Sequence, residues 1–231
     1  MLLRNDTALV TGAGQGIGKA VADALKEEGA RVFPVDKADF DLSLPGSALS
    51  LVDAAIERLQ KISIFVHAAS PPRKESQTAT QVTESEWREM LEVNLNAGFL
   101  IGQRLGNHMR EQKIRGRMLF VTSLHAESPR NLPHYSASKA GQTMVMKELA
   151  RALGPAGIRV NALAPGAVPG AGFKGSPELV QRIALGRVAK PEDIAPMAVA
   201  VLSERFGAYV TGATIVVDGG LALYNWLEAS P

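Results

Sequence analysis

A glycine-dense segment near the amino terminus constrains the fold of this chain more than any other feature. Residues 7–18 read TALVTGAGQGIG, in which an apolar run leads into a turn rich in glycine. A helical pattern over residues 19–28 follows and is closed by Gly29. A strand, a glycine turn and a helix in this order direct free backbone N–H groups and the positive end of the helix to one point. The segment therefore predicts a binding site for a phosphate group.

The spacing of the glycines bears on which phosphate compound would bind. Gly12, Gly16 and Gly18 lack the Cβ atoms that would keep the backbone away from a pyrophosphate. Their pattern is G-x-x-x-G-x-G, whereas the standard dinucleotide fingerprint is G-x-G-x-x-G. A glycine-rich turn alone is a weak signal, and a turn without a ligand is the alternative. The position of this turn directly after a strand favours a dinucleotide.

The composition narrows the functional classes. The chain has 231 residues, enough for one large α/β domain, and its 25 basic and 23 acidic residues lack the basic block typical of nucleic-acid binding. Cysteine is absent and the four histidines are scattered, so no disulfide and no metal site is predicted. The first six residues, MLLRND, bring in charged residues after only three apolar ones, which is not the pattern of a signal peptide. No apolar run is long enough to cross a bilayer. We therefore expect a cytoplasmic protein.

Short β-branched runs alternate with helical patterns along the rest of the chain. Strands are predicted at residues 31–36, 62–68, 118–122, 158–163 and 214–218, and helices at residues 48–60, 85–109, 135–153 and 191–202. Alternating strands and helices, with strands that are apolar almost throughout, predict a doubly wound parallel sheet. No linker-like segment divides the chain, so residues 1–231 are predicted to form a single α/β domain.

Two chemical constellations lie at the carboxyl ends of the predicted strands, where open α/β sheets bind ligands. Asp36 ends the second strand and can accept hydrogen bonds from an adenosine ribose, although a solvated loop acid is an equal alternative. Tyr135 and Lys139 lie four apart on one helical face, and Ser123 follows the preceding strand. An ammonium beside a phenol favours phenolate and lowers the phenol pKa, so Tyr135 could exchange a proton with an alcohol or a carbonyl. Ser123 could donate a hydrogen bond to the same oxygen.

Together these motifs resemble the short-chain dehydrogenases/reductases, a family that includes the ketoacyl-carrier-protein reductases. The resemblance covers residues 7–221. Its ordered motifs are Thr11-Gly12 with Gly16-Ile17-Gly18, Asp36, Val93-Asn94-Leu95, Thr122-Ser123, the YSASK run of residues 135–139, the IRVN run of 158–161, Ala164-Pro165-Gly166, Thr211-Gly212 and the VDGG run of 217–220. The resemblance implies a Rossmann-like fold and an NAD(H)-dependent oxidoreductase that interconverts a secondary alcohol and a ketone or another small carbonyl.

The resemblance also implies a role for each catalytic residue. Tyr135 would be the general acid/base, and Ser123 would bind the reacting oxygen. Lys139 would hold the nicotinamide ribose and depress the pKa of Tyr135. Asn94 would position a water that links Lys139 to solvent, the alternative being an ordinary polar residue inside a helix.

The same resemblance implies the cofactor contacts. Pro165, Gly166 and Val168 would line the nicotinamide, and Asp41 and Leu42 would frame the adenine. The full predicted set is Gly12, Gln15, Gly16, Ile17, Gly18, Asp36, Asp41, Leu42, Ala68, Ala69, Ser70, Tyr135, Lys139, Pro165, Gly166 and Val168. Asp36 and the neutral Gln15 favour NAD over NADP, because a 2′-phosphate would lie against the carboxylate. Lys37 is counter-evidence, since its ammonium could reach that phosphate.

The chain departs from the family pattern in several places. Only four residues separate Asp36 from Asp41, so we expect that the helix after the second strand is lost and that a stub of the next strand remains. His67 stands where the family commonly has asparagine, and we interpret it as structural. His125, Glu127 and His134 lie in the loop between Ser123 and Tyr135 and could contact the substrate, but a surface position is the favoured interpretation for each. Residues 167–186 are predicted to form the substrate lid.

The family commonly forms tetramers, so a homotetramer, or alternatively a homodimer, is expected through the helices at residues 85–109 and 135–153.

Two other functions stay open. A non-redox enzyme on the same scaffold would usually abandon the lysine, and a dinucleotide-sensing protein would lose the catalytic residues. Lys139 and the intact serine and tyrosine favour the oxidoreductase with a small-molecule substrate.

Overall fold

A six-stranded sheet runs through the computed structural model, which describes residues 1–74, 78–170, 173 and 175–224. Its strands lie in the order β2-β1-β3-β4-β5-β6, and every neighbouring pair is parallel. Their bounds are β1 Thr7–Thr11, β2 Arg31–Val35, β3 Ile64–His67, β4 Arg117–Val121, β5 Arg159–Pro165 and β6 Thr214–Val217. The predicted doubly wound, Rossmann-like α/β fold is confirmed.

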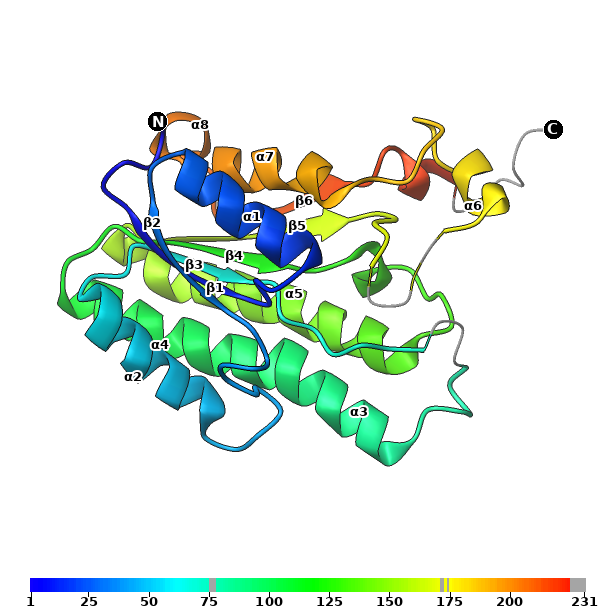
Figure 1. Ribbon diagram of the computed structural model, residues 1–231, viewed down its shortest axis with the longest axis horizontal. Coiled ribbons are helices and arrows are strands. Elements are labelled where there is room, and N and C mark those ends of the chain that lie inside the picture. The colour runs from blue at the N-terminus through cyan, green and yellow to red at the C-terminus, as the bar shows by residue number, and fades with distance from the viewer. Residues whose placement is uncertain (75–77, 171–172, 174, 225–231) are drawn as a thin grey trace.

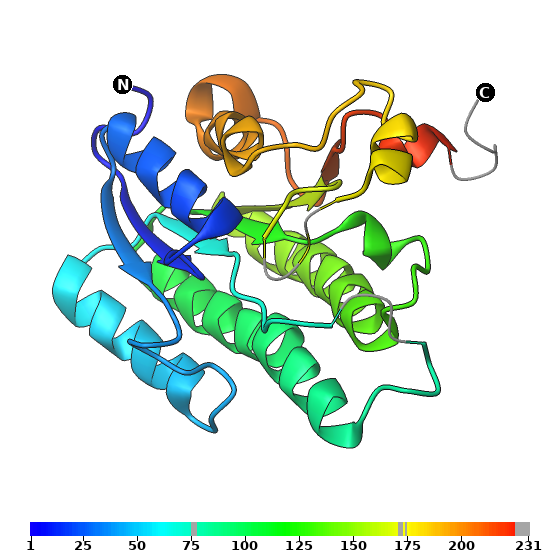
Figure 2. The ribbon, with the colours of Figure 1, turned by 45° about the vertical axis from the view of Figure 1, so that its right-hand side comes forward.

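Helices cover both faces of the sheet (Figure 1 and Figure 2). One face carries α1 (Gly16–Glu27), α7 (Pro191–Leu202) and α8 (Glu204–Gly207), and the other carries α2 (Ser47–Leu59), α4 (Ala97–Glu111) and α5 (Pro133–Leu153). α1 packs on α7, and α4 packs between α2 and α5. α3 (Glu84–Leu91) and α6 (Pro177–Gln181) lie toward the end of the sheet where the strands terminate.

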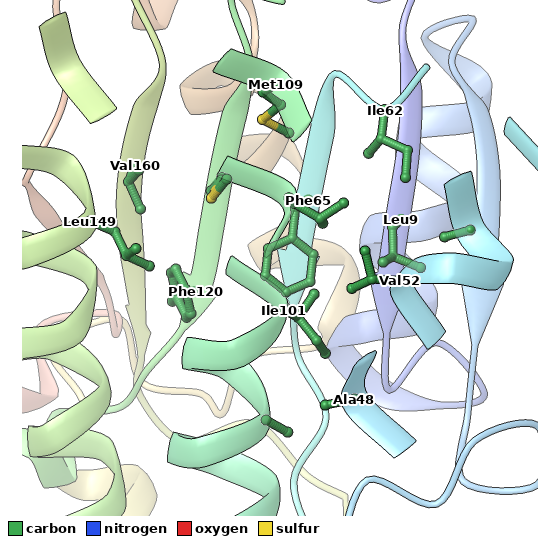
Figure 3. Close-up of a cluster of buried hydrophobic side chains, with 14 of the residues drawn as sticks. Leu9, Ala48, Val52, Ile62, Phe65, Ile101, Met109, Phe120, Leu149 and Val160 are labelled. Atoms are coloured by element: carbon green, nitrogen blue, oxygen red, sulfur yellow. The ribbon is translucent and has the colours of Figure 1, made fainter. Parts of the chain in front are cut away.

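Two apolar cores fill the layers between the sheet and its helices. Successive strand residues point to opposite faces, so Leu9 and Phe65 pack toward α2 and α4 while Val10 and Val66 pack toward α1 and α7. Figure 3 shows the first core, in which Phe65 and Phe120 meet edge to face at 6.0 Å between ring centroids. Both faces of the central strands are therefore buried, as their continuous apolar sequences predict.

The helix predicted over residues 85–109 contains a π turn. α3 continues through η1 (Glu92–Asn96), which has π geometry, into α4. Its start is fixed by a capping box, because Thr83 accepts a hydrogen bond from the Glu86 backbone N–H and Glu86 accepts one from that of Thr83. The π turn shifts the helical register at Asn94, a residue that the resemblance assigned to the site.

The segment after β2 has less regular structure than we expected. It contains turns only, so the predicted stub of strand does not form and β2 is the edge of the sheet. Side chains take up backbone donors that a strand would offer to a neighbour, because Asp39 accepts from the Asp36 N–H at 3.0 Å and Asp41 accepts from the Ser43 N–H at 3.0 Å. Gly46, with a φ of 80°, then begins α2.

Candidate active site

A cavity of about 700 Å³ opens where β1, β3, β4 and β5 end. Every predicted site residue except Asn94 lines this cavity. These lining residues are Gly12, Gln15, Gly16, Ile17, Gly18, Asp36, Asp41, Leu42, Ala68, Ala69, Ser70, Ser123, Tyr135, Lys139, Pro165, Gly166 and Val168. The topology thus brings together motifs that lie far apart in the sequence, at the position where open α/β sheets bind ligands.

The glycine turn after β1 has the shape that a phosphate requires. Gly12 has a φ of 66°, and a Cβ there would lie 2.7 Å from the Cα of Ala69, so the ends of β1 and β3 approach closely only with glycine. Gly16 has a φ of 56° and nothing within 4 Å of its missing Cβ. The N-cap residue of α1, Gln15, makes no side-chain cap hydrogen bond. The first N–H groups of α1 therefore remain available to a dinucleotide pyrophosphate, which fits here.

Carboxylates lie at the β2 end of the cavity. Asp36 is half-buried, and its carboxylate fills the space beside Gly14 that a Cβ would occupy. Lys37 lies 3.6 Å from Asp41 and 3.5 Å from Glu89, so its ammonium is drawn toward two carboxylates other than Asp36. Hydrogen bonds from Ser43, together with the Lys37 charge, lower the pKa of Asp41. Asp41 is therefore held as a carboxylate at this end of the cavity.

The predicted catalytic residues meet at the other end of the cavity. Ser123 caps the turn η2 (Leu124–Ala126) and accepts a hydrogen bond from the His125 N–H at 3.2 Å. Tyr135 lies in the first turn of α5 and is nearly buried. The Lys139 ammonium is 5.6 Å from the centre of the Tyr135 ring, and the Arg73 guanidinium is 4.1 Å from it. Two cationic groups thus flank the phenol.

Lys139 is held by its neighbours but not neutralised by them. Its Nζ donates to the carbonyl of Val121 at 2.7 Å and to Gln142 Oε1 at 3.2 Å. Both acceptors are neutral, so burial lowers the pKa of Lys139 to about 7, with the charge of Arg73 contributing in the same direction. Lys139 therefore titrates near neutral pH.

Asn94 lies behind the cavity instead of in its wall. Its Nδ2 donates to Ser138 Oγ at 2.8 Å, and its backbone carbonyl accepts from Gln142 Nε2 at 2.9 Å. Its Oδ1 is buried without a hydrogen-bond partner among the described residues. The sequence interpretation missed Gln142, although its position three residues after Lys139 on α5 places both side chains on one face.

His67 forms a buried link between elements. Its Nδ1 is 2.9 Å from Thr11 Oγ1, and its Nε2 is 3.1 Å from the carbonyl of Val93. A carbonyl can only accept, so Nε2 carries the proton and Nδ1 accepts from the threonine hydroxyl. Burial lowers the pKa of His67 to about 3. A neutral His67 thus ties β1 and β3 to η1, as a structural residue would.

The surface interpretation of His125 and His134 is wrong. His125 lines the cavity with its ring 5.3 Å from that of Tyr135, because η2 turns the chain back over α5. Burial lowers its pKa to about 4, with Arg130 and Arg73 contributing. His134 is 1% exposed. Arg73 and Arg130 also line the cavity, and no spacing pattern in the sequence pointed to either.

Several described residues of the segment predicted as the lid line the cavity. Gly170, Phe173 and Leu179 line it, and Gly170 and Phe173 exchange two backbone hydrogen bonds of 2.9 Å. Residues 171, 172 and 174 of this segment lie outside the described part of the chain. Within the described ranges, no cluster of His, Asp and Glu is arranged for a metal ion, and no helix is long and apolar enough to span a membrane.

Two family models and several known proteins match this chain over most of its length. The family model for short chain dehydrogenases matches residues 6–44, and that for enoyl-(acyl carrier protein) reductases matches residues 38–222. Glucose 1-dehydrogenase 2 of Bacillus subtilis is 32% identical, with 96% of each chain covered. 3beta-hydroxysteroid dehydrogenase 1 of Eggerthella lenta is also 32% identical, with 96% of this chain and 95% of the relative covered.

Solved structures are similar over the same length. The 3-ketoacyl-(acyl-carrier-protein) reductase from Brucella melitensis, complexed with NADH, has a TM-score of 0.89 at 31% identity, covering 96% of this chain and 100% of that one. A gluconate 5-dehydrogenase described as putative and NAD(P) dependent, from Beutenbergia cavernae with bound NADP, has a TM-score of 0.85 at 29% identity, covering 96% and 98%. The chain therefore belongs to the short-chain dehydrogenase/reductase family and is an oxidoreductase.

Proposed function

We propose that this enzyme transfers a hydride between a nicotinamide dinucleotide and a secondary alcohol or a ketone. The observation that carries the proposal is the meeting of Ser123, Tyr135 and Lys139 in one cavity whose far end is the glycine turn of α1. The names of the relatives, which include dehydrogenases of a sugar and a steroid and a ketoacyl reductase, support this reaction class.

Each catalytic side chain has a defined task in this proposal. The nicotinamide ring, when bound, supplies or accepts the hydride at the carbon that carries the oxygen. Tyr135 gives its phenolic proton to the carbonyl oxygen during reduction and takes a proton from the hydroxyl during oxidation. Ser123 donates a hydrogen bond to that oxygen as negative charge develops on it. Lys139 and Arg73 stabilise negative charge on the phenol oxygen after the proton leaves.

Lys139 would also hold the nicotinamide ribose, and the residues after β5 would line the nicotinamide. Gly166 supports this arrangement, because a Cβ there would lie 2.7 Å from the Cα of Asp218 and would force β5 and β6 apart. Gly12, Gly16 and Gly18 would approach the pyrophosphate. The lid, residues 167–186, would close over the substrate within a single domain.

NAD is the proposed cofactor. Asp36 ends β2 where the adenosine ribose would lie, and a 2′-phosphate would bring negative charge against it. Lys37, the residue that could offset this repulsion, is within 3.6 Å of Asp41 and Glu89. Gln15 adds no positive charge at the glycine turn.

We also propose a homo-oligomer of cytoplasmic residence, a tetramer or a dimer. Phe99 on α4 is 38% exposed and Met144 on α5 is 56% exposed, which supports burial of these helices against a second copy. Light scattering at micromolar concentration is expected to give a multiple of 24.5 kDa. A stable monomer would contradict this part of the proposal.

A panel of ketones, aldehydes and secondary alcohols tests the function. The absorbance of the reduced cofactor reports turnover, and each compound is assayed with NAD(H) and with NADP(H). We expect turnover of at least one secondary alcohol or ketone, with NAD(H) preferred. A protein that binds dinucleotide and yields product without a change in cofactor absorbance would instead be a non-redox enzyme, and binding without any product would identify a sensing protein.

A further inference from the structure

The charged residues that line the cavity are unevenly distributed. The acidic ones gather at the β2 end: Asp36, Asp41 and Glu89. Tyr135 lies near the end of β4, three strand spacings or about 14 Å from β2. In the described lining around it, the charged groups are cationic: Arg73, Arg130 and Lys139. The β2 end thus holds three carboxylates and one cation, Lys37, whereas the described charged lining at the other end is cationic. Asp218 acts on Arg130 from outside that lining.

Arg73 and Arg130 both act on the end of the cavity that holds Tyr135, the reaction end. The Arg73 guanidinium lies over the Tyr135 ring at 4.1 Å, and Arg73 and Arg130 are both half-buried residues. His125, whose ring contacts Tyr135, has its pKa lowered by burial and then by the charges of Arg130 and Arg73. Both arginines therefore act electrostatically on the His125 ring that contacts Tyr135, and Arg73 also contacts the Tyr135 ring itself.

This concentration of positive charge suits an anionic ligand. Arg73 also contributes to the lowered pKa of Lys139, so the two cations disfavour one another. An anion between them would offset that repulsion. A guanidinium has five N–H donors in a planar fork, so it can hold a carboxylate on one edge while another edge keeps its contacts within the protein.

We propose that the substrate is a hydroxy acid, or the corresponding oxo acid, whose carboxylate is bound by Arg73 and Arg130 close to the reacting carbon. This inference rests on the proposed function and names its substrate class. The reaction keeps its balance: the carbinol carbon loses a hydride to the nicotinamide, its hydroxyl loses a proton to Tyr135, and the carboxylate is unchanged.

Matched acids and amides test this inference. 2-Hydroxypropanoate and 3-hydroxybutanoate are compared with their amides, which have nearly the same size without the charge. We expect kcat/KM to be at least about tenfold higher for an acid than for its amide. Arg130→Gln is expected to lower the value for the acid about tenfold, the order of a lost charge-assisted hydrogen bond, and to leave the amide within about twofold. Arg73→Gln is expected to lower the value for both compounds, because Arg73 also stabilises the deprotonated phenol, and to lower it about tenfold more for the acid than for the amide. Lys74→Gln, an exposed neighbouring cation paired with Glu86, is the control and is expected to change neither.

Calorimetric binding of the oxo acids and their amides to the enzyme–cofactor complex makes the test independent of turnover. Equal affinity for acid and amide, or equal losses for both in the arginine variants, would overturn the inference. Turnover of neutral ketones without preference for acids would overturn it while leaving the proposed oxidoreductase function intact. Failure of every compound to change the cofactor would overturn the proposed function, whereas the calorimetric comparison would still decide the inference.

A second observation concerns Gln142. Its side chain is buried and bridges Lys139 to η1, because Oε1 accepts from Lys139 Nζ at 3.2 Å and Nε2 donates to the Asn94 carbonyl at 2.9 Å. The resemblance implied that Asn94 positions a water linking Lys139 to solvent. In the structure the Gln142 amide joins Lys139 directly to the Asn94 carbonyl.

The amide and a water differ in chemistry. A water can accept one proton while it releases another, whereas the amide only accepts at its oxygen and donates from its nitrogen. We infer that Gln142 is a positioning residue, which orients the Lys139 side chain against the Asn94 carbonyl and blocks proton transfer along that link. The inference rests on the proposed role of Lys139.

Two variants test this role through the pH profile of kcat. Gln142→Glu places a carboxylate beside Lys139 and is expected to move the profile upward by at least one pH unit, since an opposite charge favours the ammonium. Gln142→Leu removes both hydrogen bonds and is expected to lower kcat about tenfold with little change in substrate KM. The other groups around Lys139 are Tyr135 on α5, Arg73 and His67. His67 stays neutral at these pH values because its pKa is about 3.

Thr143→Val is the matched control. Its hydroxyl donates to the backbone carbonyl of Lys139 at 3.0 Å and not to the ammonium, so the variant tests for a general effect on α5. We expect it to keep the wild-type profile. Wild-type pH profiles in both Gln142 variants, with turnover retained, would overturn the inference. A loss of kcat in Gln142→Leu with an unmoved profile in Gln142→Glu would also contradict it and indicate a merely structural role.

Discussion

The β2 end of the cavity, the nucleotide end, and the reaction end at Tyr135 hold their polar groups in different ways. At the nucleotide end, backbone N–H groups of the glycine turn and carboxylates on the turns after β2 face the cavity, and Lys37 is 63% exposed. At the reaction end, Lys139 and Asn94 are 2% exposed or less and are joined through Gln142. One end is open and solvated, and the other is a buried network.

The difference predicts how each end responds to substitution. Exposed charges contribute little individually and are screened by salt. Single changes at the nucleotide end are therefore expected to change the ratio of kcat/KM for NAD to that for NADP by moderate amounts. A buried network loses its geometry when one member is removed, and the remaining groups stay desolvated. Changes at the reaction end are therefore expected to lower turnover far more than they lower cofactor affinity.

The largest effect is expected for Tyr135→Phe. The ring and its packing are retained, but the transferable proton is lost, so kcat is expected to fall about 100-fold or more. Cofactor affinity, measured by titration, is expected to change less than about threefold. Tyr209→Phe, at a fully exposed tyrosine, is the control. Retention of most activity by Tyr135→Phe would contradict the assignment.

The next effect is expected for Asp36→Ala. Removal of the carboxylate lifts its repulsion from a 2′-phosphate, so the ratio of kcat/KM for NAD to that for NADP is expected to fall about tenfold. Both cofactors are assayed with one substrate. Asp53→Ala serves as the control, because Asp53 is an exposed carboxylate of α2 that pairs with Arg104 of α4. An NADP preference in the wild type, or an unchanged ratio in the variant, would show that Asp36 does not select the cofactor.

A smaller effect concerns stability, because the buried Lys139 titrates near pH 7. Its folded pKa lies below the value of 10.5 of the free side chain, so the unfolded state binds more protons between about pH 7 and 10.5. The penalty for burying the charge is full below pH 7 and is relieved as the pH rises through that window. Lys139→Met is therefore expected to raise Tm at pH 6 by a few degrees, on the order of 2–4 °C per kcal/mol, and by less at pH 9.5.

Lys147→Met provides the same substitution at an exposed site of α5 and is expected to change Tm little at either pH. Cofactor is omitted from both measurements, so that binding does not contribute to Tm. A Tm difference for Lys139→Met that grew with pH would have the wrong sign and would contradict the buried, unneutralised ammonium.

The smallest effect is expected for Lys37→Ala. The ammonium is exposed and shared between Asp41 and Glu89, so its removal is expected to change the NAD to NADP ratio by less than about threefold. A tenfold or larger increase in NAD preference would show that Lys37 reaches the 2′-phosphate and that the nucleotide end is less open than we describe.

The sequence predicted the parts of this molecule that depend on local patterns. The glycine turn at residues 12–18 and the apolar strands are short-range features, so their positions and the parallel sheet followed from spacing. Tyr135 and Lys139 were recognisable because they lie one helical turn apart. The capping-box sequence at residues 83–86 predicted the start of the helix that follows it.

Features that depend on tertiary contacts could not be predicted in this way. The segment after β2 forms no strand because Asp39 and Asp41 take up backbone donors, which a strand-like spacing does not reveal. His125 was expected at the surface, but the turn at η2 folds it onto Tyr135. Arg73 reaches Tyr135 from a loop 62 positions away along the chain, and no local pattern specifies that approach.

The most direct test of the account follows a hydride from substrate to cofactor. A secondary alcohol that the enzyme oxidises is labelled with deuterium on its carbinol carbon, and the reduced nicotinamide product is examined by mass spectrometry. The account predicts one deuterium in each molecule of reduced cofactor, with none lost to water, and loss of this transfer in Tyr135→Phe. Product formation without deuterium in the cofactor would contradict hydride transfer as the reaction of this enzyme.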